Sequence, residues 1–183
     1  MTLNATISKI IDEVISIEAG YVNNPNDSGG PTKYGITEKV ARADGYMGDM
    51  RDLPLERARS ILYRRYVIQP GFDRVLSLSE AVAVELVDTG VNCGTTVPGP
   101  FLQRCLNVLN YDGRLPELVV DGIIGRNTEK ALSGFLAWRG KDGEKQLVKM
   151  LNCLQGERYI SLAESRRKDR TFVYGWFSNR VKI

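Results

Sequence analysis

The sequence contains no histidine. Ser-His-Asp and Cys-His hydrolases use an imidazole as general base, and zinc hydrolases commonly bind their metal through histidine. The absence excludes the first two chemistries and argues against the third. Catalysis would have to use carboxylates, hydroxyls, lysine or cysteine, and we expect neither a metal nor an organic cofactor.

Cysteines are few and apolar runs are short. Cys93, Cys105 and Cys153 form no CxxC pair, which predicts small reduced core residues and not a disulfide framework. No run approaches the roughly 18 apolar residues of a membrane span. The first residues, MTLNATISKIIDEV, lack a basic segment followed by an apolar one, so no secretory signal is predicted.

The charges are almost balanced, with 25 basic and 22 acidic residues and a net charge of +3. This excess is far below that of a dedicated nucleic-acid-binding protein, so no nucleic-acid partner is expected. A dense basic cluster consists of Arg166, Arg167, Lys168 and Arg170. It is typical of a solvated face, and it could also adsorb to an anionic wall or membrane surface.

Hydrophobic periodicity predicts a predominantly α fold of the α+β type, with one small β-hairpin or loop element near the N-terminus. Thr37, Asp52 and Ser79 are the predicted caps of three helices, the last of them apolar nearly all round and therefore central. No linker composition is visible, and we expect one lobe over residues 1–92 and a helical lobe packed on it over residues 93–183. The other predicted helices are 5–18, 98–109, 127–138, 143–165 and 171–181.

Glu18 ends the first predicted helix on its apolar face, one turn after Val14 and two turns after Ile11. Partial desolvation and the negative end of the helix dipole would both raise the pKa of its carboxyl group. A protonated glutamate is what a general acid needs to protonate a glycosidic oxygen. The alternative is a solvated glutamate at a frayed helix end.

The segment that follows Glu18 is rich in Gly, Asn and Pro and can fold back as a hairpin. Such a reversal would bring Asp27 or Thr32 opposite Glu18, where glycoside hydrolysis needs a second polar group as nucleophile or to activate water. Tyr21 and Tyr34 would offer flat surfaces and hydroxyls to sugar rings. A plain turn around Asp27 is the alternative.

Further polar candidates lie in the second half of the chain. Asp88 and Asn92, one helical turn apart, could bond the N-acetyl groups of a sugar chain or the local backbone, and the sequence leaves both readings open. Gln103 is a candidate of the same kind. The stretch VVDGIIGRNTEKAL either presents a turn to a substrate or forms a β-turn before a helix capped by Asn127; the second reading is favoured for most of its residues.

The stretch EAGYVNNPNDSGGPTKYGIT, followed by GYMGDMRDLP, resembles the start of family 108 of the glycoside hydrolases, bacterial and phage N-acetylmuramidases of lysozyme-like fold. The segments VDTGVNCG, FLQRCLNVLN, VDGIIGRNTEKAL and GWFSNRV resemble the second half of such proteins, often described as a peptidoglycan-binding region. The resemblance covers about residues 8–181. It implies an enzyme of the phage endolysin type, with a catalytic muramidase lobe over residues 1–92 and a peptidoglycan-binding-like lobe over residues 93–183.

The family's catalytic glutamate falls on Glu18. The spacing of Glu18, Asp27 and Thr32 resembles the Glu-Asp-Thr constellation of phage lysozymes, with one residue fewer between Asp and Thr. Two departures stand out: Ala19 replaces the usual glycine, and Tyr66-Val67 stands where the resemblance predicts Tyr-Trp. One aromatic contact is therefore expected to be absent.

Together these observations predict a peptidoglycan hydrolase that cleaves the β-1,4 bond between N-acetylmuramic acid and N-acetylglucosamine, with Glu18 as general acid. Two alternatives stay open: a lytic transglycosylase that uses the same glutamate, and a non-catalytic wall-binding or secretion-accessory protein. The expected partner is the glycan strand, and we expect a monomer. Without a secretory signal, such an enzyme would be made in the host cytoplasm and act on the periplasmic wall after release.

Overall fold

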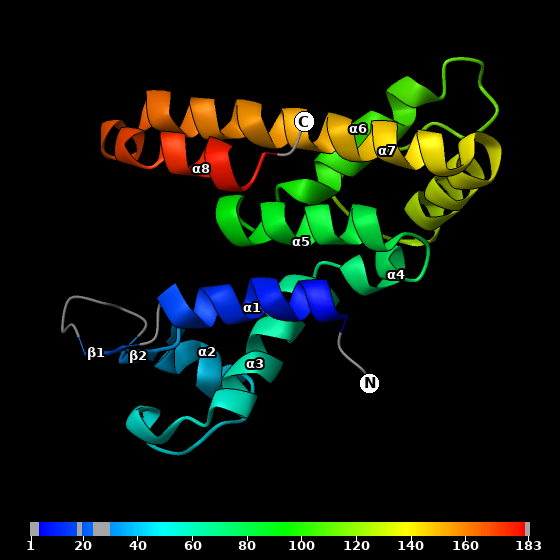
Figure 1. The fold of residues 1–183 in the computed structure, drawn as a ribbon. Helices are drawn as coiled ribbons and strands as arrows, with labels where there is room; N and C mark the ends of the chain where they lie inside the picture. Colours follow the sequence, from blue (N-terminus) through cyan, green and yellow to red (C-terminus); the bar gives the residue numbers. More distant parts are fainter. Residues whose placement is uncertain (1–3, 18–19, 24–29, 182–183) are drawn as a thin grey trace. The chain divides into compact units, whose positions relative to one another are not determined.

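The computed structural model describes residues 4–17, 20–23 and 30–181 of the chain. The chain folds into two compact units, which comprise residues 1–68 and residues 69–183 (Figure 1). Helices dominate, and a small antiparallel sheet lies near the N-terminus, which confirms the predicted fold class. The predicted lobe boundary between residues 92 and 93 falls at the end of a helix of the second unit; as a division of function it stays a prediction.

The first unit is built on helix α1 (Ala5–Ile17). The side-chain oxygen of Asn4 accepts hydrogen bonds from the backbone N–H groups of Thr6 and Ile7, which caps this helix. Ile7, Ile10, Ile11 and Ile15 are buried at helical spacing, as the periodicity predicts, and α1 packs against α3. The further elements are β1 (Tyr21–Val22), β2 (Thr32–Lys33), β3 (Ile36–Thr37), α2 (Glu38–Ala43), the 3₁₀ helix η1 (Met50–Asp52), α3 (Leu55–Tyr63) and the π-helical turn η2 (Arg64–Ile68).

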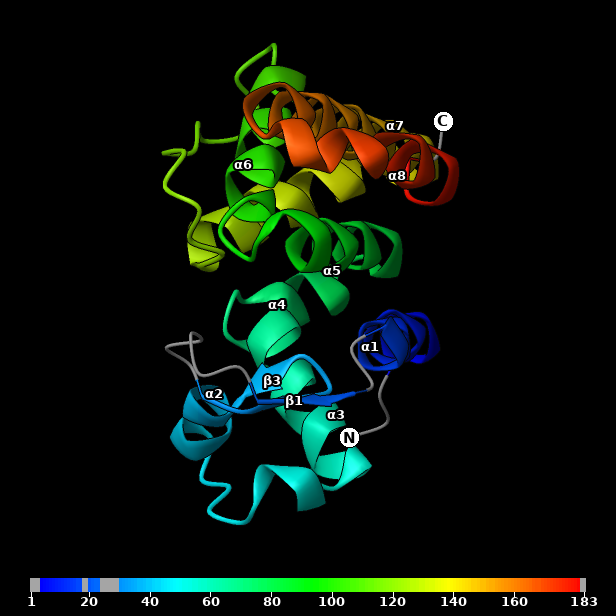
Figure 2. The same cartoon turned by 90° about the vertical axis from the view of Figure 1, so that its left-hand side faces the viewer.

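The sheet has the order β1-β2-β3, and both pairs are antiparallel (Figure 2). Val22 and Thr37 each lie opposite Thr32, and Tyr21 and Ile36 each lie opposite Lys33. Ile36 is buried and belongs to the core of the unit, whereas Tyr21, in the same row of side chains, is exposed. The sequence predicted one hairpin or loop here, and the structure has two hairpins that share β2.

Two details of the first unit differ from the sequence-based expectation. Asp52 does not cap α3: it belongs to η1, and the residue before α3 is Pro54, which makes no side-chain capping bond. The predicted cap was wrong because Asp49 supplies that function one element earlier, by accepting a bond from the N–H of Arg51. Val67, at the position where a tryptophan was expected, is fully buried in η2, so this position belongs to the core and not to an exposed contact.

The second unit surrounds helix α5, whose predicted cap Ser79 is confirmed, because its hydroxyl accepts a bond from the N–H of Val82. α5 packs against α4, α6 and α7. Two predicted helices merge into α7, which is interrupted at Gly140, a residue with φ 58° and ψ −151°. The predicted cap Asn127 lies inside α7, whose N-cap residue is Gly125. The elements are α4 (Phe72–Leu76), α5 (Glu80–Cys93), α6 (Pro98–Leu109), α7 (Arg126–Ser165), the 3₁₀ helix η3 (Arg167–Thr171) and α8 (Val173–Asn179).

The three cysteines are free thiols with different surroundings. Cys105 is buried and Cys93 is half-buried, and burial raises the pKa of each thiol to about 11. Cys153 is exposed, so the expectation of a core residue is wrong there, because it lines an open groove between α6 and α7. Among the described residues, no helix combines the length and apolar character that crossing a bilayer requires.

Candidate active site

The predicted active site falls on the sheet of the first unit. Glu18 and Asp27 lie outside the described residues, so the structure gives no contacts for them. Thr32 is in β2, Tyr21 is in β1, and Tyr34 follows β2 directly. The structure thus brings the three described candidates of the first unit onto one small sheet.

The hydroxyl of Thr32 is the unusual polar group of this sheet. Its oxygen is inaccessible to solvent, and it has no hydrogen-bond partner within the part of the chain that the structure describes. A buried hydroxyl without a partner costs about 1–3 kcal/mol, so native proteins seldom retain one unless a water or a ligand completes it. Thr37, its cross-strand neighbour, uses its own hydroxyl to cap α2. Thr32 therefore has free hydrogen-bonding capacity that its neighbour lacks.

Tyr34 and Gly35 form the two-residue turn between β2 and β3. Both have positive φ, 55° and 72°, as a type I′ turn requires. Asparagine and glycine adopt this region readily, whereas a residue such as tyrosine is disfavoured there by about 1–2 kcal/mol. The turn alone would favour asparagine at position 34. A strained tyrosine at this position points to a use for its ring or hydroxyl.

A lysine joins the sheet to the next loop. The ammonium group of Lys33 donates a hydrogen bond to the backbone oxygen of Arg51, in η1, and lies 5.0 Å from the centre of the Tyr34 ring. Asp49 in turn holds the side chain of Arg51 through a bidentate contact whose shortest distance is 2.6 Å. These contacts fix β2 against η1, and with it Thr32.

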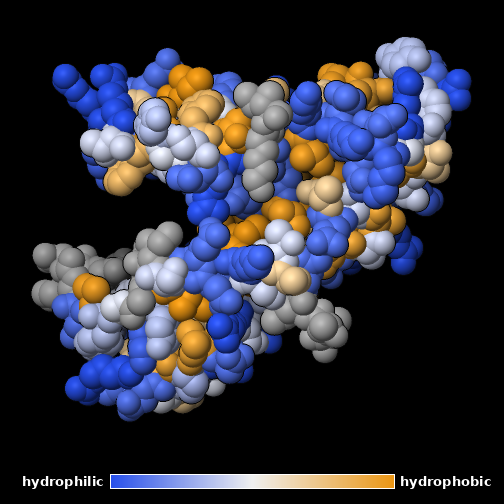
Figure 3. Space-filling model, in the orientation of Figure 1, coloured by the Kyte–Doolittle hydropathy of each residue, from blue (hydrophilic) through white to orange (hydrophobic). Residues whose placement is uncertain are grey.

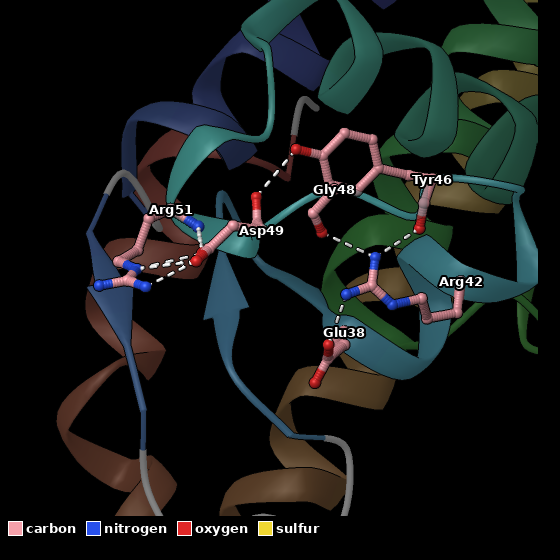
Figure 4. Close-up of polar contacts among 6 residues, drawn as sticks. All are labelled: Glu38, Arg42, Tyr46, Gly48, Asp49 and Arg51. Carbon is pink, nitrogen blue, oxygen red and sulfur yellow. Dashed lines mark hydrogen bonds and ion pairs between the residues drawn. The ribbon is translucent and has the colours of Figure 1, made fainter.

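Arg42 organises the loop between α2 and η1 (Figure 4). Its guanidinium donates to the backbone oxygens of Tyr46 (2.7 Å) and Gly48 (2.8 Å) and pairs with Glu38 one turn earlier (2.6 Å). The hydroxyl of Tyr46 donates to the backbone oxygen of Asp49 at 2.8 Å. The loop is therefore held from α2 at one end and presents Asp49 to Arg51 at the other.

The charges of this loop stay fixed over the working range of pH. Hydrogen bonds from the side chain and backbone of Arg51 lower the pKa of Asp49 to about 2. The same contact raises the pKa of Arg51. Both groups remain ionised from mildly acidic to alkaline pH, so the loop does not respond to protonation in that range.

Asp88 and Asn92 lie on α5 in the second unit. The two carboxylate oxygens of Asp88 accept hydrogen bonds from Gln155 (2.8 Å) and from Arg180 (2.9 Å). The amide of Asn92 donates to the backbone oxygen of Asp88 at 2.8 Å, the local bond that was one of its two predicted uses. Both side chains are thus engaged inside the unit.

Gln103 is also engaged, as the first of three amide side chains, of which Gln103 and Asn107 lie on α6 and Asn110 is the residue that caps its C-terminal end. Its amide nitrogen donates to Asp121 (2.8 Å), and its amide oxygen accepts from the N–H of Gly122 (2.8 Å). Asn107 and Asn110 each donate to and accept from one backbone residue, Leu118 and Leu115 respectively. We call Gln103, Asn107 and Asn110 the amide ladder, because these three side chains pair with residues 115–122 as a neighbouring strand would.

The amide ladder holds a segment whose outer side chains are apolar. Hydrogen bonds from Gln103 and from the N–H of Ile123 lower the pKa of Asp121, which keeps this turn acceptor charged. Val119 is 78 % exposed and Ile123 is 67 % exposed. Between this segment and the start of α7 lies a cavity of about 360 Å³, lined also by Gln103 and Arg126. A rigid turn that keeps large apolar side chains in solvent is typical of a contact surface.

Arg42, Lys33 and two members of the amide ladder, Asn107 and Asn110, are residues that the sequence did not single out. The spacing of Glu38 and Arg42 by one helical turn was a usable signal, as was the spacing of the three amides on α6. Lys33 gave no signal, because its partner is a backbone oxygen distant in sequence. Among the described residues, no group of three or more Cys, Asp or Glu side chains could hold a metal ion.

The fold defines the class of the protein: two compact units, mostly helical, with a small antiparallel sheet in the first. Comparisons with known proteins then give the family. Residues 11–94 match the family model of "Glycosyl hydrolase 108", and residues 97–181 match the one described as "Predicted Peptidoglycan domain". The first part of the chain therefore belongs to the glycosyl hydrolase 108 family and the second to the family of peptidoglycan domains, which confirms the resemblance seen in the sequence.

Solved structures add support for the fold. Eight chains are similar, among them "Structure of Brucella abortus SagA", with a TM-score of 0.59, 22% sequence identity, and coverage of 94% of this chain and 88% of that chain. At this identity the likeness concerns the fold alone. Among proteins with curated descriptions, none matches. The two family matches together define a peptidoglycan hydrolase of the glycoside hydrolase class.

The contacts of Asp88 predict a structural effect of its removal. Asp88→Ala removes the acceptor of the hydrogen bonds from Gln155 and Arg180, so we expect the free energy of unfolding to fall by about 3 kcal/mol. Urea denaturation followed by tryptophan fluorescence measures it, since Trp176 lies in the same unit. Asp142→Ala, which removes an exposed pair with Lys145, is the matched control and should unfold as wild type does. An Asp88→Ala variant of wild-type stability that has lost activity would contradict this reading and favour a substrate contact.

Proposed function

We propose that this peptidoglycan hydrolase is an N-acetylmuramidase, which hydrolyses the β-1,4 bond between N-acetylmuramic acid and N-acetylglucosamine. The observation that carries the proposal is the buried hydroxyl of Thr32, which has no hydrogen-bond partner among the described residues and lies on a sheet inside the glycosyl hydrolase 108 region. It supports a role for Thr32 beside Glu18 and Asp27, which precede it at a spacing that resembles that of phage lysozymes, with one residue fewer between Asp27 and Thr32. We further propose that the enzyme is made in the cytoplasm and reaches the wall after release.

In this mechanism the carboxyl group of Glu18 protonates the glycosidic oxygen as the bond to the anomeric carbon breaks. Asp27 and the hydroxyl of Thr32 orient a water molecule that attacks the anomeric carbon, and the negative charge of Asp27 stabilises the oxocarbenium-like transition state. The water loses its proton to a carboxylate, and the cleaved chain gains a reducing end. Tyr34, held in its strained turn, and Tyr21 would support the sugar rings on either side.

Glu18→Gln tests the general acid. The amide preserves the shape of the side chain and cannot donate the proton, so we expect peptidoglycan clearing to slow by about 10²–10⁴-fold. Mass spectrometry of the soluble products measures the bond that is cut: a muramidase releases reducing N-acetylmuramic acid ends. Anhydro ends in the wild-type digest would assign a lytic transglycosylase instead, and equal clearing by both proteins would refute the role of Glu18.

Thr32→Val tests the water-orienting hydroxyl separately from the fold. Valine has nearly the same shape and removes a buried hydroxyl that has no partner among the residues that the structure describes, so the melting temperature should stay unchanged or rise. We expect kcat to fall by about 100-fold with little change in KM. Thr32→Ser keeps the hydroxyl and serves as control, with most of the activity retained. Full activity of Thr32→Val, or an equal loss in both variants, would contradict the proposal.

The part of the chain that matches a peptidoglycan domain, residues 97–181, would contact the same polymer at the cavity beside the amide ladder. Its apolar rim, Val119 and Ile123, suits the alanyl methyl groups and sugar faces of peptidoglycan, and Arg126 suits its carboxylates. The match of this region to a peptidoglycan domain supports the assignment. The cavity lies at the stretch VVDGIIGRNTEKAL, for which the sequence analysis favoured a turn and a helix start over a substrate contact.

Ile123→Ser tests this contact in a Glu18→Gln background, where the polymer is not consumed. Because burial of an isoleucine contributes about 1.5–3 kcal/mol, we expect binding to insoluble peptidoglycan in a pelleting assay to weaken at least about ten-fold. Val108→Ser is the matched control, since Val108 is 65 % exposed on α6 outside this cavity, and should bind as the parent does. Equal binding by both variants would remove the cavity from the wall contact.

A further inference from the structure

The C-terminal end of the second unit carries aromatic and basic side chains that the glycosidase mechanism does not use. No residue of η3 or α8 is buried. Tyr174 is 86 % exposed and Phe172 is 57 % exposed. Arg167 and Lys168 are exposed and make no side-chain hydrogen bond or ion pair with the described residues. We call Arg167, Lys168, Phe172 and Tyr174 the C-terminal surface.

The C-terminal surface has a firm base. Trp176 stacks on the fully buried Tyr159, with ring centres 4.9 Å apart, and Phe172 lies 6.0 Å from Trp176. Arg170 donates a hydrogen bond to the backbone oxygen of Ala163 at the end of α7. Phe172 is therefore anchored through Trp176 to the buried Tyr159. In Figure 3, strongly hydrophilic and apolar side chains lie next to one another over the end of α7 from which η3 departs.

The charge of this surface is strongly one-sided. Four of the five residues 166–170 are basic. The acidic one, Asp169, is largely buried and lies 3.8 Å from Arg166, so it offsets little of the positive charge presented to solvent. A partner with a negatively charged face fits this distribution.

The combination of exposed aromatic rings and cations narrows the class of partner. A soluble polyanion would account for the basic residues and would leave Phe172 and Tyr174 without a use. At the surface of an anionic bilayer, aromatic rings insert at the level of the headgroups while basic side chains bind the lipid phosphates. α8 has only seven residues, so it would lie on the surface and not cross it.

We propose that the C-terminal surface docks on an anionic phospholipid bilayer. Phe172 and Tyr174 enter the headgroup region, and Arg167 and Lys168 contact the phosphates. The proposal is independent of the glycosidase mechanism, because none of these residues belongs to the candidate active site or to the cavity beside the amide ladder. It gives the basic cluster of the sequence a ligand of defined chemistry.

Co-sedimentation with vesicles tests the proposal on the full chain. We expect the protein to pellet with vesicles of phosphatidylglycerol and phosphatidylethanolamine and not with vesicles of phosphatidylcholine. Raising the salt from about 0.1 M to about 0.5 M should weaken binding, because the Debye length shortens from about 10 Å to about 4 Å. Equal binding to both vesicle types, or to neither, would overturn the proposal.

Two double variants separate the contribution of the basic side chains to vesicle binding from that of the aromatic side chains. The charge variant Arg167→Gln/Lys168→Gln should weaken vesicle binding about 30-fold. The aromatic variant Phe172→Ser/Tyr174→Ser should lose most of the vesicle binding. Lys130→Gln/Lys149→Gln and Tyr111→Ser remove similarly exposed residues elsewhere in the unit and should bind as wild type does. Circular dichroism confirms that each variant is folded. If only the charge variant loses binding and soluble polyphosphate competes for it, the surface is a polyanion site and the bilayer proposal is wrong.

Discussion

The two-residue turn at Tyr34–Gly35 is the constraint on which the described part of the candidate active site depends. Its two positive φ angles join β2 to β3 without a loop and so fix which residues lie opposite each other. A turn longer by one residue would shift the register and move Thr32 to the other face of the sheet. The location of one hydroxyl thus follows from the backbone conformation of the two residues that come after β2.

Strands of two residues cannot keep this geometry alone, and the neighbouring loop supplies the remainder. Arg42 holds the loop backbone from α2, Asp49 holds Arg51, and Lys33 bonds the backbone of Arg51. The chain of contacts runs from a helix to the strand that carries Thr32. Because Asp49 and Arg51 stay ionised well beyond neutral pH on both sides, the pH dependence of activity should come from the catalytic carboxyl groups and not from this scaffold.

The sequence predicted the elements that depend on local signals. Helices α1, α5 and α6 follow from hydrophobic spacing and caps, and Ser79 caps its helix as expected. Asp52 was misread because an aspartate before a proline has the same local pattern whether it caps a helix or ends a 3₁₀ turn. The sheet register was out of reach, because two-residue strands carry no periodicity and a tyrosine with positive φ contradicts its own conformational preference. Glu18 and Asp27 remain predictions of the sequence alone.

Polar candidates in the second unit show why site residues are harder to predict than helices. Asp88 and Gln103 carry polar groups that could bind a sugar. In the fold these groups make internal hydrogen bonds instead: Asp88 on α5 bonds Gln155, 67 residues away, and Gln103 on α6 bonds Asp121 in the turn. A sequence cannot show which use applies, since both partners are distant along the chain. With Asp88 and Gln103 bonded within the fold, this unit presents apolar and basic side chains such as Ile123, Tyr174 and Lys168 to solvent, and these side chains decide what it binds.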